Sequence, residues 1–219
     1  MGLREFKKEQ TRRLLIETAW RMFSDRGFEQ VKVAEIARAA MVSEATVFKY
    51  FPTKEGLFFS GLEDFGDRLI AAVREREPGE SALVACRRFL LGGIGGLLAQ
   101  IESGDAQALD RLRTVSRVVA ESPTLQAREQ QVIAGYTEAL AGLLAEEVGA
   151  GDDDIGPRVA ANALIGAHRT LIGEVRRRAA SLDDPRMFAT DVHRAGTHAF
   201  ALLEHGLRDY AIKPAAAPQ

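Results

Sequence analysis

Cysteine is almost absent from this chain, which has one cysteine, Cys86, among its 219 residues. A single cysteine excludes an internal disulfide framework and is typical of a protein in a reducing compartment. Its neighbours Val84, Ala85 and Phe89 are apolar, so we expect a buried thiol rather than a nucleophile.

Long apolar runs are also lacking. The longest, FLLGGIGGLLA at residues 89–99, is about half the roughly 20 residues that a membrane span needs. The opening MGLREFKKEQTRR has no apolar core followed by a small-residue cleavage site, so we do not expect it to be a signal peptide. We therefore expect a soluble cytoplasmic protein with no membrane partner.

No large excess of charge of either sign is present: the net charge is −2 and the pI is near 6.1. The charge is unevenly placed, however, with +3 over residues 1–60 and −5 over the remainder. This modest asymmetry indicates a basic N-terminal module on an acidic body, and taken alone it carries little weight.

The sequence shows no convincing β-alternation, and nearly every segment has the apolar spacing of a helix. Residues with turn or capping chemistry separate these segments, such as Gly27 after the first helix and Thr53 before the fourth. We predict an all-α fold with a small N-terminal bundle and a larger C-terminal one. The expected helices cover residues 8–26, 33–40, 44–51, 54–77, 80–102, 105–121, 123–148, 155–181 and 185–211.

Two of these helices are short and joined by a tight turn, in AEIARAA-MV-SEATVFKYF at residues 34–51. This spacing matches a helix-turn-helix over about residues 33–51. Ser43 is placed to cap the second helix. Val47 and Phe51, four residues apart, are expected to point back toward the core and hold that helix in place.

The opposite face of the second helix presents Ala45, Thr46, Lys49 and Tyr50. A helix face with small side chains at one end and hydrogen-bonding groups along its length can enter a major groove. Lys54, at the start of the next helix, is placed to contact a phosphate. The same spacing also fits any small bundle with a polar outer face, but the cluster of cations and aromatic residues favours DNA binding.

Residues 11–58 resemble the DNA-binding domain of the tetracycline-repressor (TetR) family. The resemblance rests on R-x-x-I/L-x-x-A-x-x-x-F, a following G-F, V-x-x-I-A-x-x-A, and V-S-x-x-T-x-F-x-Y-F-x-x-K-x-x-L. It implies a dimeric bacterial transcriptional regulator, commonly a repressor that a small ligand releases from DNA. It also places Thr46, Tyr50 and Lys54 against the DNA backbone, and residues 44, 45 and 49 against bases.

Three residues depart from the family pattern. Lys32 stands where a Thr commonly caps a helix and contacts phosphate; a lysine can reach phosphate but cannot cap. Met41 replaces the usual turn glycine, where a positive φ costs a side chain roughly 1 kcal/mol. Glu44 could accept a hydrogen bond from a cytosine amino group or favour the helix N-terminus; we favour the second role. The predicted DNA-binding residues are Lys32, Ser43, Glu44, Ala45, Thr46, Phe48, Lys49, Tyr50 and Lys54.

The predicted domains are a helix-turn-helix DNA-binding domain at residues 8–54, a ligand-binding and dimerisation domain at 55–212, and a disordered tail at 213–219. Within the second domain, residues 158–178 have an apolar arc wider than a surface helix needs, and the last helix has a stripe of small residues. Both features predict a four-helix dimer interface, although a monomeric core would also fit. The predicted interface residues are Leu164, Leu171, Val175, Val192, Ala195, Ala199, Leu202 and Gly206.

Four glycines in five residues, GGIGG at 92–96, are unusual within a predicted helix. They either allow neighbouring helices to approach closely or leave room beside an apolar cavity. A cavity in the bundle would bind a hydrophobic or amphipathic ligand. The C-terminal part also resembles TetR-family regulators that sense fatty acyl thioesters, so an acyl thioester or another apolar metabolite or drug is the expected partner. The candidate ligand contacts are Phe65, Leu69, Phe89, Ile94, Leu97, Leu112, Arg113, Val115, Arg117, Tyr136, Asn162 and His168.

No nucleophile–base pair, paired carboxylates or metal-ligand spacing supports catalysis, so we expect neither an enzyme nor a cofactor or metal. His168 is more readily explained as a core residue than as a ligand contact. The leading hypothesis is a homodimeric repressor that a small ligand releases from a near-palindromic, double-stranded operator, in the cytoplasm at the nucleoid. The alternatives are a regulator that acts without ligand or as an activator, and an all-α carrier or enzyme.

Overall fold

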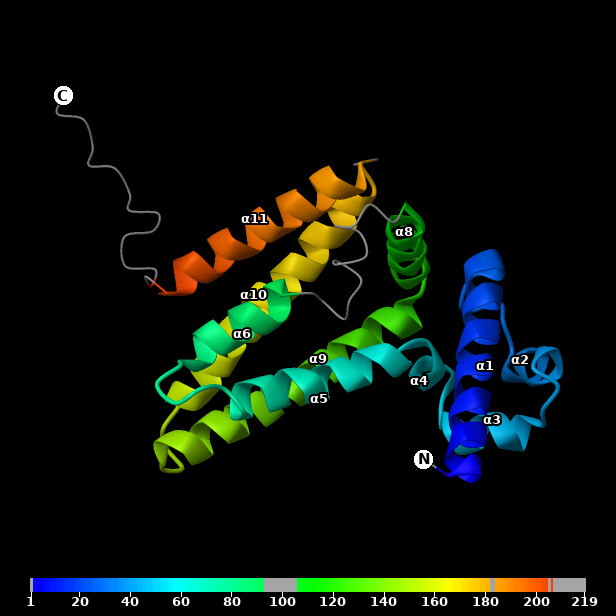
Figure 1. Cartoon of the computed structure of the whole chain (residues 1–219), viewed down its shortest axis with the longest axis horizontal. Coiled ribbons are helices and arrows are strands. Elements are labelled where there is room, and N and C mark those ends of the chain that lie inside the picture. The colour runs from blue at the N-terminus through cyan, green and yellow to red at the C-terminus, as the bar shows by residue number, and fades with distance from the viewer. Residues whose placement is uncertain (1, 93–105, 182–183, 205, 207–219) are drawn as a thin grey trace. The chain divides into compact units, whose positions relative to one another are not determined.

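The computed structural model describes residues 2–92, 106–181, 184–204 and 206 (Figure 1). Within these ranges the chain forms ten α-helices and no strand, which confirms the predicted all-α fold. In none of the described helices is an apolar stretch long enough to cross a bilayer. The helices are α1 (Leu3–Arg26), α2 (Val33–Ala39), α3 (Glu44–Tyr50), α4 (Lys54–Phe58), α5 (Ser60–Arg74), α6 (Ala82–Leu91), α8 (Ala106–Ala120), α9 (Pro123–Val148), α10 (Gly156–Ala179) and α11 (Pro185–Glu204).

The single helix predicted over residues 54–77 is wrong, because the chain forms two helices there, α4 and α5. Leu57, Phe58 and Phe59 are all buried. Three consecutive side chains span about 200° around a continuous helix, so one helix could not direct all three into the same core. The break at Phe59 changes the direction of the chain, so that all three side chains can be buried. The predicted cap is confirmed, since Thr53 Oγ1 accepts a hydrogen bond of 2.9 Å from the N–H of Gly56.

The helix predicted over residues 80–102 is shorter in its described part, where α6 ends at Leu91 with Gly92 as its C-cap. The other glycines of the GGIGG segment lie outside the described residues, as does the predicted tail at 213–219.

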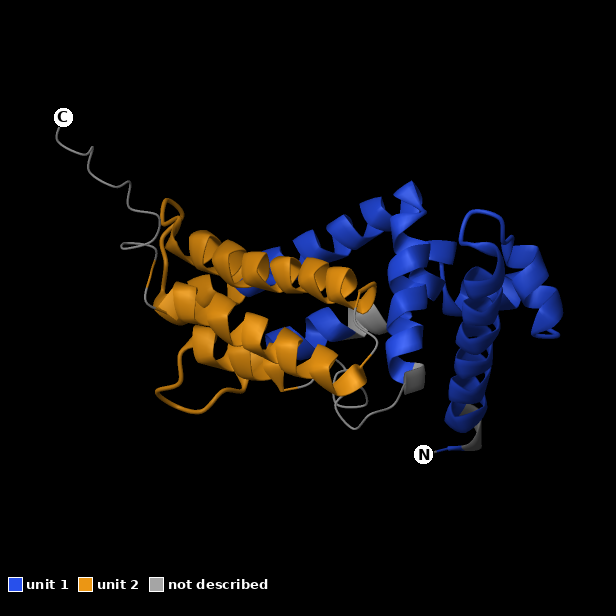
Figure 2. Cartoon of the chain, turned by 90° about the horizontal axis from the view of Figure 1, so that it is seen from above, with its two compact units in different colours: residues 1–71, 106–140 blue, residues 72–105, 141–219 orange. Residues whose placement is uncertain are grey.

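The chain divides into two compact units (Figure 2). Unit 1 comprises residues 1–71 and 106–140, and unit 2 comprises residues 72–105 and 141–219. Unit 1 therefore contains the predicted DNA-binding segment 8–54 together with α8 and most of α9, which come from much later in the sequence.

Aromatic side chains form the centre of unit 1. The rings of Phe23 and Phe28 lie 5.1 Å apart, and those of Trp20 and Phe58 lie 4.6 Å apart between centroids. Val118 and Val119 of α8 belong to the same buried cluster as these rings. Aromatic pairs at such distances contribute beyond their buried area, so this core fixes α1, α4 and α8 to one another.

Unit 2 is a helical bundle in which α11 packs against both α10 and α6. A methyl group added to Gly196 of α11 would collide with the side chain of Leu91 of α6. Arg178 Nη1 on α10 lies 3.1 Å from Asp191 Oδ2 on α11. Cys86 is fully buried in α6, and burial raises the pKa of its thiol to about 12.

Candidate nucleic-acid interface

Helix α3 begins at a side-chain cap that the sequence predicted. Ser43 Oγ accepts a hydrogen bond of 3.1 Å from the N–H of Thr46, and the two hydroxyl oxygens lie 2.9 Å apart. Val47 is buried on the inner side of the helix, and Phe51 is buried directly after it. A helix of seven residues is unstable alone, so these contacts are what hold it in place.

The outer side of α3 is open to solvent. Glu44, Ala45, Phe48 and Lys49 are exposed, and Phe48 retains 46% of its accessible surface. Tyr50 is half-buried and packs against the core of unit 1 with part of its ring. Small, charged, aromatic and hydroxyl-bearing groups therefore share one accessible surface, as recognition of a major groove requires.

The turn before α3 contains a strained residue. Met41 has φ +56°, and it is the one residue other than glycine with positive φ in the described ranges. The N–H of Met41 bonds to the carbonyl of Arg38 at 3.1 Å, and the N–H of Val42 bonds to that of Ala37 at 2.9 Å. These two bonds form a Schellman motif that ends α2 and directs the chain into α3. The expected positive φ at Met41 is confirmed.

Lys32 precedes α2 at the N-cap position, where its side chain forms no capping hydrogen bond. The N–H of Lys32 instead donates to Glu35 Oε2 at 2.9 Å. Arg26 Nη1 donates to Glu35 Oε1 at 2.8 Å, and this hydrogen bond lowers the pKa of the Glu35 carboxyl. The side chain of Lys32 is exposed and remains accessible to a phosphate.

Lys54 has a structural role that sequence reasoning missed. Its Nζ donates to the carbonyls of Phe28 at 2.9 Å and Val31 at 3.1 Å, and lies 4.0 Å from the centroid of the Phe28 ring. Burial lowers the pKa of this ammonium, against the opposing attraction of Glu29 and Glu55. Two of its three N–H groups therefore serve the segment between α1 and α2. The phosphate contact remains a prediction that only the third N–H could fulfil.

Two further contacts tie this segment to the corner between α8 and α9. Ser122 Oγ donates to Glu29 Oε1 at 2.5 Å, and Arg117 Nη2 donates to the carbonyl of Ser24 at 2.9 Å. Each pair is 93 residues apart in the sequence. No local pattern could have indicated them. Arg117, a candidate ligand contact, instead joins α8 to the end of α1.

The structure distributes the other candidate ligand contacts over both units, while Ile94 and Leu97 lie outside the described residues. In unit 1, the rings of Phe65 and Tyr136 meet at 6.3 Å and Leu69 is fully buried. Val115 packs against the core beside α1, and Leu112 and Arg113 are half-buried. In unit 2, Phe89 is half-buried, Asn162 is exposed, and His168 is buried with a pKa lowered to about 4 by desolvation.

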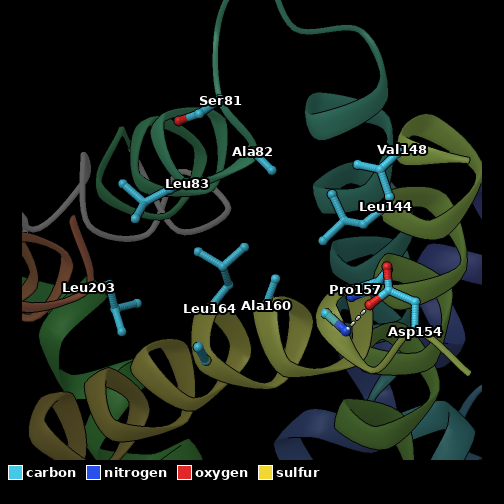
Figure 3. Close-up of a pocket in the computed structure, with 12 residues that line it drawn as sticks. Ser81, Ala82, Leu83, Leu144, Val148, Asp154, Pro157, Ala160, Leu164 and Leu203 are labelled. Carbon is cyan, nitrogen blue, oxygen red and sulfur yellow. Dashed lines mark hydrogen bonds between the residues drawn. The ribbon is translucent and has the colours of Figure 1, made fainter. Parts of the chain in front are cut away.

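An apolar pocket in unit 2 is lined by none of the twelve candidate ligand contacts (Figure 3). Its volume is about 530 Å³. The walls come from the start of α6, the end of α9, the start of α10 and Leu203 of α11. Sequence reasoning missed this pocket because its lining residues are aliphatic and resemble ordinary core positions.

The predicted dimer residues differ in accessibility. Leu164, Leu171, Val175 and Val192 are buried within the single chain. Ala195, Ala199 and Leu202 are half-buried, and Gly206 is exposed. The first four therefore pack inside their own protomer, and an interface between copies would use the more exposed positions of α10 and α11.

The three short helices, the capped α3 with its exposed outer face, and the turn at Met41 define a helix-turn-helix DNA-binding protein. A family model of TetR-type bacterial regulatory proteins matches residues 15–60, and a model of the MftR C-terminal domain matches residues 95–207. The second match covers more than half of the chain. The protein belongs to the TetR family of DNA-binding transcriptional regulators, with an MftR-type C-terminal domain. It is a regulator and not an enzyme, and the predicted family is confirmed.

Relatives with named functions extend over most of the chain. TcmR, a transcriptional regulator of Streptomyces glaucescens, is 29% identical over 72% of this chain and 69% of its own length. MftR of Mycobacterium tuberculosis, named for mycofactocin biosynthesis, is 26% identical over 82% of this chain and 87% of its own. The structure of SmeT in complex with triclosan matches with a TM-score of 0.57 at 15% identity, over 96% of this chain and 98% of that one, and it shows the shared fold.

Proposed function

We propose that this regulator is a homodimeric repressor, released from a near-palindromic operator by a small hydrophobic or amphipathic ligand. The observation that carries the proposal is the exposed outer face of α3, held by the Ser43 cap and the buried Val47. Two such helices in a symmetric dimer would enter successive major grooves on one side of the DNA. Occupancy of the operator would then exclude the transcription machinery.

Within this proposal, Glu44, Ala45 and Lys49 face base edges, while Lys32, Thr46 and Tyr50 contact phosphates and sugars. Ser43 is the side chain that caps α3, and the carboxylate of Glu44 is exposed. This arrangement supports base reading by Glu44 over the capping role that the sequence favoured. A carboxylate in the major groove accepts a hydrogen bond from the cytosine N4 amino group.

Dimerisation is proposed to use the outer surfaces of α10 and α11. Val159 is 58% exposed on α10, and Gly173 is exposed on the same helix. Small residues on a solvent-facing helix allow the close approach of a partner helix, as the family resemblance implies. The measurement is sedimentation velocity, in which Gly173→Glu, outside the pocket lining, should convert a dimer to a monomer.

Release by ligand requires that ligand binding to the C-terminal part favours one position of the two α3 helices of the dimer over another. The contacts Glu29–Ser122 and Arg117–Ser24 connect the corner between α8 and α9 to the segment before α2. We infer that a shift of this corner reaches α2 and α3 through these contacts. To move the equilibrium from mostly bound to mostly free, the ligand must prefer the released state by about 5 kcal/mol.

The proposal is tested by electrophoretic mobility shift with DNA from upstream of the regulator's own gene and its neighbours, at moderate salt. We expect a specific complex that Lys49→Ala and Tyr50→Ala weaken. Absence of a specific complex, or a complex that neither substitution affects, would refute the proposed DNA interface. A complex that resists release by a panel of apolar metabolites would favour the ligand-independent alternative.

A further inference from the structure

The pocket in unit 2 has the dimensions of a small-molecule site. Its volume of about 530 Å³ falls within the range of roughly 300–1,000 Å³ that such sites occupy. Leu144 and Leu164 point into the space between α6, α9 and α10 (Figure 3). Because Val148 at the edge of the pocket is 68% exposed, an occupant would remove further apolar surface from water.

The walls of the pocket are aliphatic. Leu83, Leu144, Val148, Leu164 and Leu203 line it, with alanines of α10 between them, and none of the described lining residues is aromatic. Such walls fit an alkyl chain or a saturated ring more closely than a stacked planar group. The body of the occupant is therefore expected to be aliphatic.

The charge of the pocket is negative. Among the twelve described residues that line it, Asp154 is the one charged residue and none is a lysine, arginine or histidine. Asp154 Oδ1 accepts a hydrogen bond of 2.8 Å from the N–H of Gly156, at the start of α10. Asp152 and Asp153 are exposed and directly precede it in the chain.

Two described arginines of neighbouring elements are paired with glutamates. Arg76 forms two hydrogen bonds with Glu147, at 2.8 and 2.6 Å. Arg88 lies 3.0 Å from Glu80. Arg158 follows Pro157 on α10 but does not line the pocket.

We propose that this pocket binds a small amphipathic cation, with its aliphatic body between α6, α9 and α10 and its ammonium group beside Asp154. An anionic amphiphile would instead place its charge near Asp152, Asp153 and Asp154, so this pocket disfavours the acyl thioester that the sequence suggested. Occupancy of the pocket is independent of the proposed repressor function. A role of the bound cation in releasing the protein from DNA would rest on that function.

The probe set is decylammonium, decanol and decanoate, which share a chain length and differ in charge. Binding to the full-length protein is measured by isothermal titration calorimetry without DNA, below the micellar concentration of each probe. We expect one site per chain, with decylammonium binding about three- to fivefold more tightly than decanol and decanoate binding more weakly than decanol, as for an ion pair with the exposed Asp154. Equal or tighter binding of decanoate would overturn the proposal.

Two pairs of variants locate the site. Ala160→Phe fills the pocket and should abolish binding of all three probes, whereas Ala139→Phe, at an exposed position of α9 outside the lining, should leave binding unchanged. Asp154→Asn keeps the acceptor for the Gly156 N–H and removes the charge. It should reduce the preference for decylammonium over decanol to less than about twofold. Asp152→Asn makes the same change of charge outside the lining and should reduce the preference less.

Retention of the preference in Asp154→Asn, or of binding in Ala160→Phe, would refute the proposed site. If Ala160→Phe instead alters the sedimentation coefficient, a second copy of the chain occupies the groove and the proposal is wrong. Mobility shifts with decylammonium are run separately. Failure to form any DNA complex would count against the repressor function and not against the pocket.

Discussion

Ser122 Oγ donates a hydrogen bond of 2.5 Å to Glu29 Oε1, and the same oxygen accepts one of 3.1 Å from the N–H of Leu125. Ser122 is 1% exposed and stands directly before α9, so it acts as the cap of that helix. Glu29 lies in the segment that leads into α2. One buried hydroxyl therefore fixes both the start of α9 and the approach to the helix-turn-helix.

Replacement of Ser122 by alanine should lower the free energy of unfolding by about 2 kcal/mol, because a cap and a hydrogen bond to a carboxylate are lost together. Glu29→Gln should cost less, since a neutral acceptor remains. Chemical denaturation of the two variants and of their double mutant measures the coupling. A coupling free energy close to zero would show that the Glu29–Ser122 bond contributes nothing.

Lys49 and Lys54 should respond differently to substitution. Lys49 is exposed on α3, so Lys49→Ala should leave stability unchanged, weaken DNA binding, and reduce the slope of log affinity against log salt by up to about 1. Lys54→Met should lower the free energy of unfolding by roughly 1–3 kcal/mol, because two carbonyls lose their donor. Arg68→Ala, at an exposed position of α5, is the matched control for loss of one charge. Equal stability losses for Lys49→Ala and Lys54→Met would contradict this division of roles.

Met41→Gly should stabilise the protein by about 0.5–1 kcal/mol, because glycine adopts φ +56° without the steric cost of a side chain. Met41 is 90% exposed, so little packing is lost with its side chain. Met41→Ala controls for that loss and should not stabilise. Met41→Val, with a β-branched side chain at positive φ, should destabilise. In thermal and urea unfolding, Met41→Gly should be more stable than the wild type, and the wild type more stable than Met41→Val. Any other order of stability would refute the strain at this turn.

His168 should make stability depend on pH in a defined window. Burial lowers its pKa to about 4 from an ordinary value near 6.5. As the pH falls below about 6.5 the unfolded chain binds a proton that the folded chain does not, so stability decreases until about pH 4 and is unaffected above 6.5. The accumulated loss is roughly 3 kcal/mol relative to neutral pH.

His168→Gln removes this titration and keeps a polar side chain of related size. Its free energy of unfolding should fall less steeply than that of the wild type between about pH 6.5 and 4, whatever its stability at neutral pH. The exposed His193 and His198 are common to both proteins, so their contributions cancel in the comparison. Parallel pH profiles would show that His168 does not titrate between the folded and unfolded states.

The fold could be predicted where the signal is local. Periodic apolar residues and the capping Ser43 located α2 and α3 to within one residue, and Gly27 located the end of α1. The start of α1 was predicted five residues too late, at residue 8 instead of Leu3. The prediction failed at Phe59, where three consecutive buried side chains forced a break that helical periodicity alone does not indicate. It also gave no sign that α8 shares a core with α1, because that contact depends on tertiary packing.

The site was predicted to a similar extent. Sequence reasoning identified α3, its outward face and the strained turn, because motif and capping chemistry are read from adjacent residues. It gave no sign that Lys54 and Arg117 donate to backbone carbonyls, and their contacts with a phosphate and a ligand stay predictions. A lysine or arginine side chain can donate to a backbone carbonyl or to a phosphate equally well. Only the folded backbone shows which acceptor lies within reach. The pocket beside Asp154 was missed because its aliphatic lining resembles ordinary core positions and comes from four separate helices.

The burial of Cys86 has a practical consequence for measuring how the two α3 helices of a dimer move. Its thiol is inaccessible and its pKa is raised to about 12, so it does not compete for thiol reagents while the protein stays folded. A second cysteine in place of the exposed Ala45 would then be the one reactive attachment point on each folded chain. Spin labels at that position in a dimer would report the separation of the two α3 helices directly, with and without decylammonium.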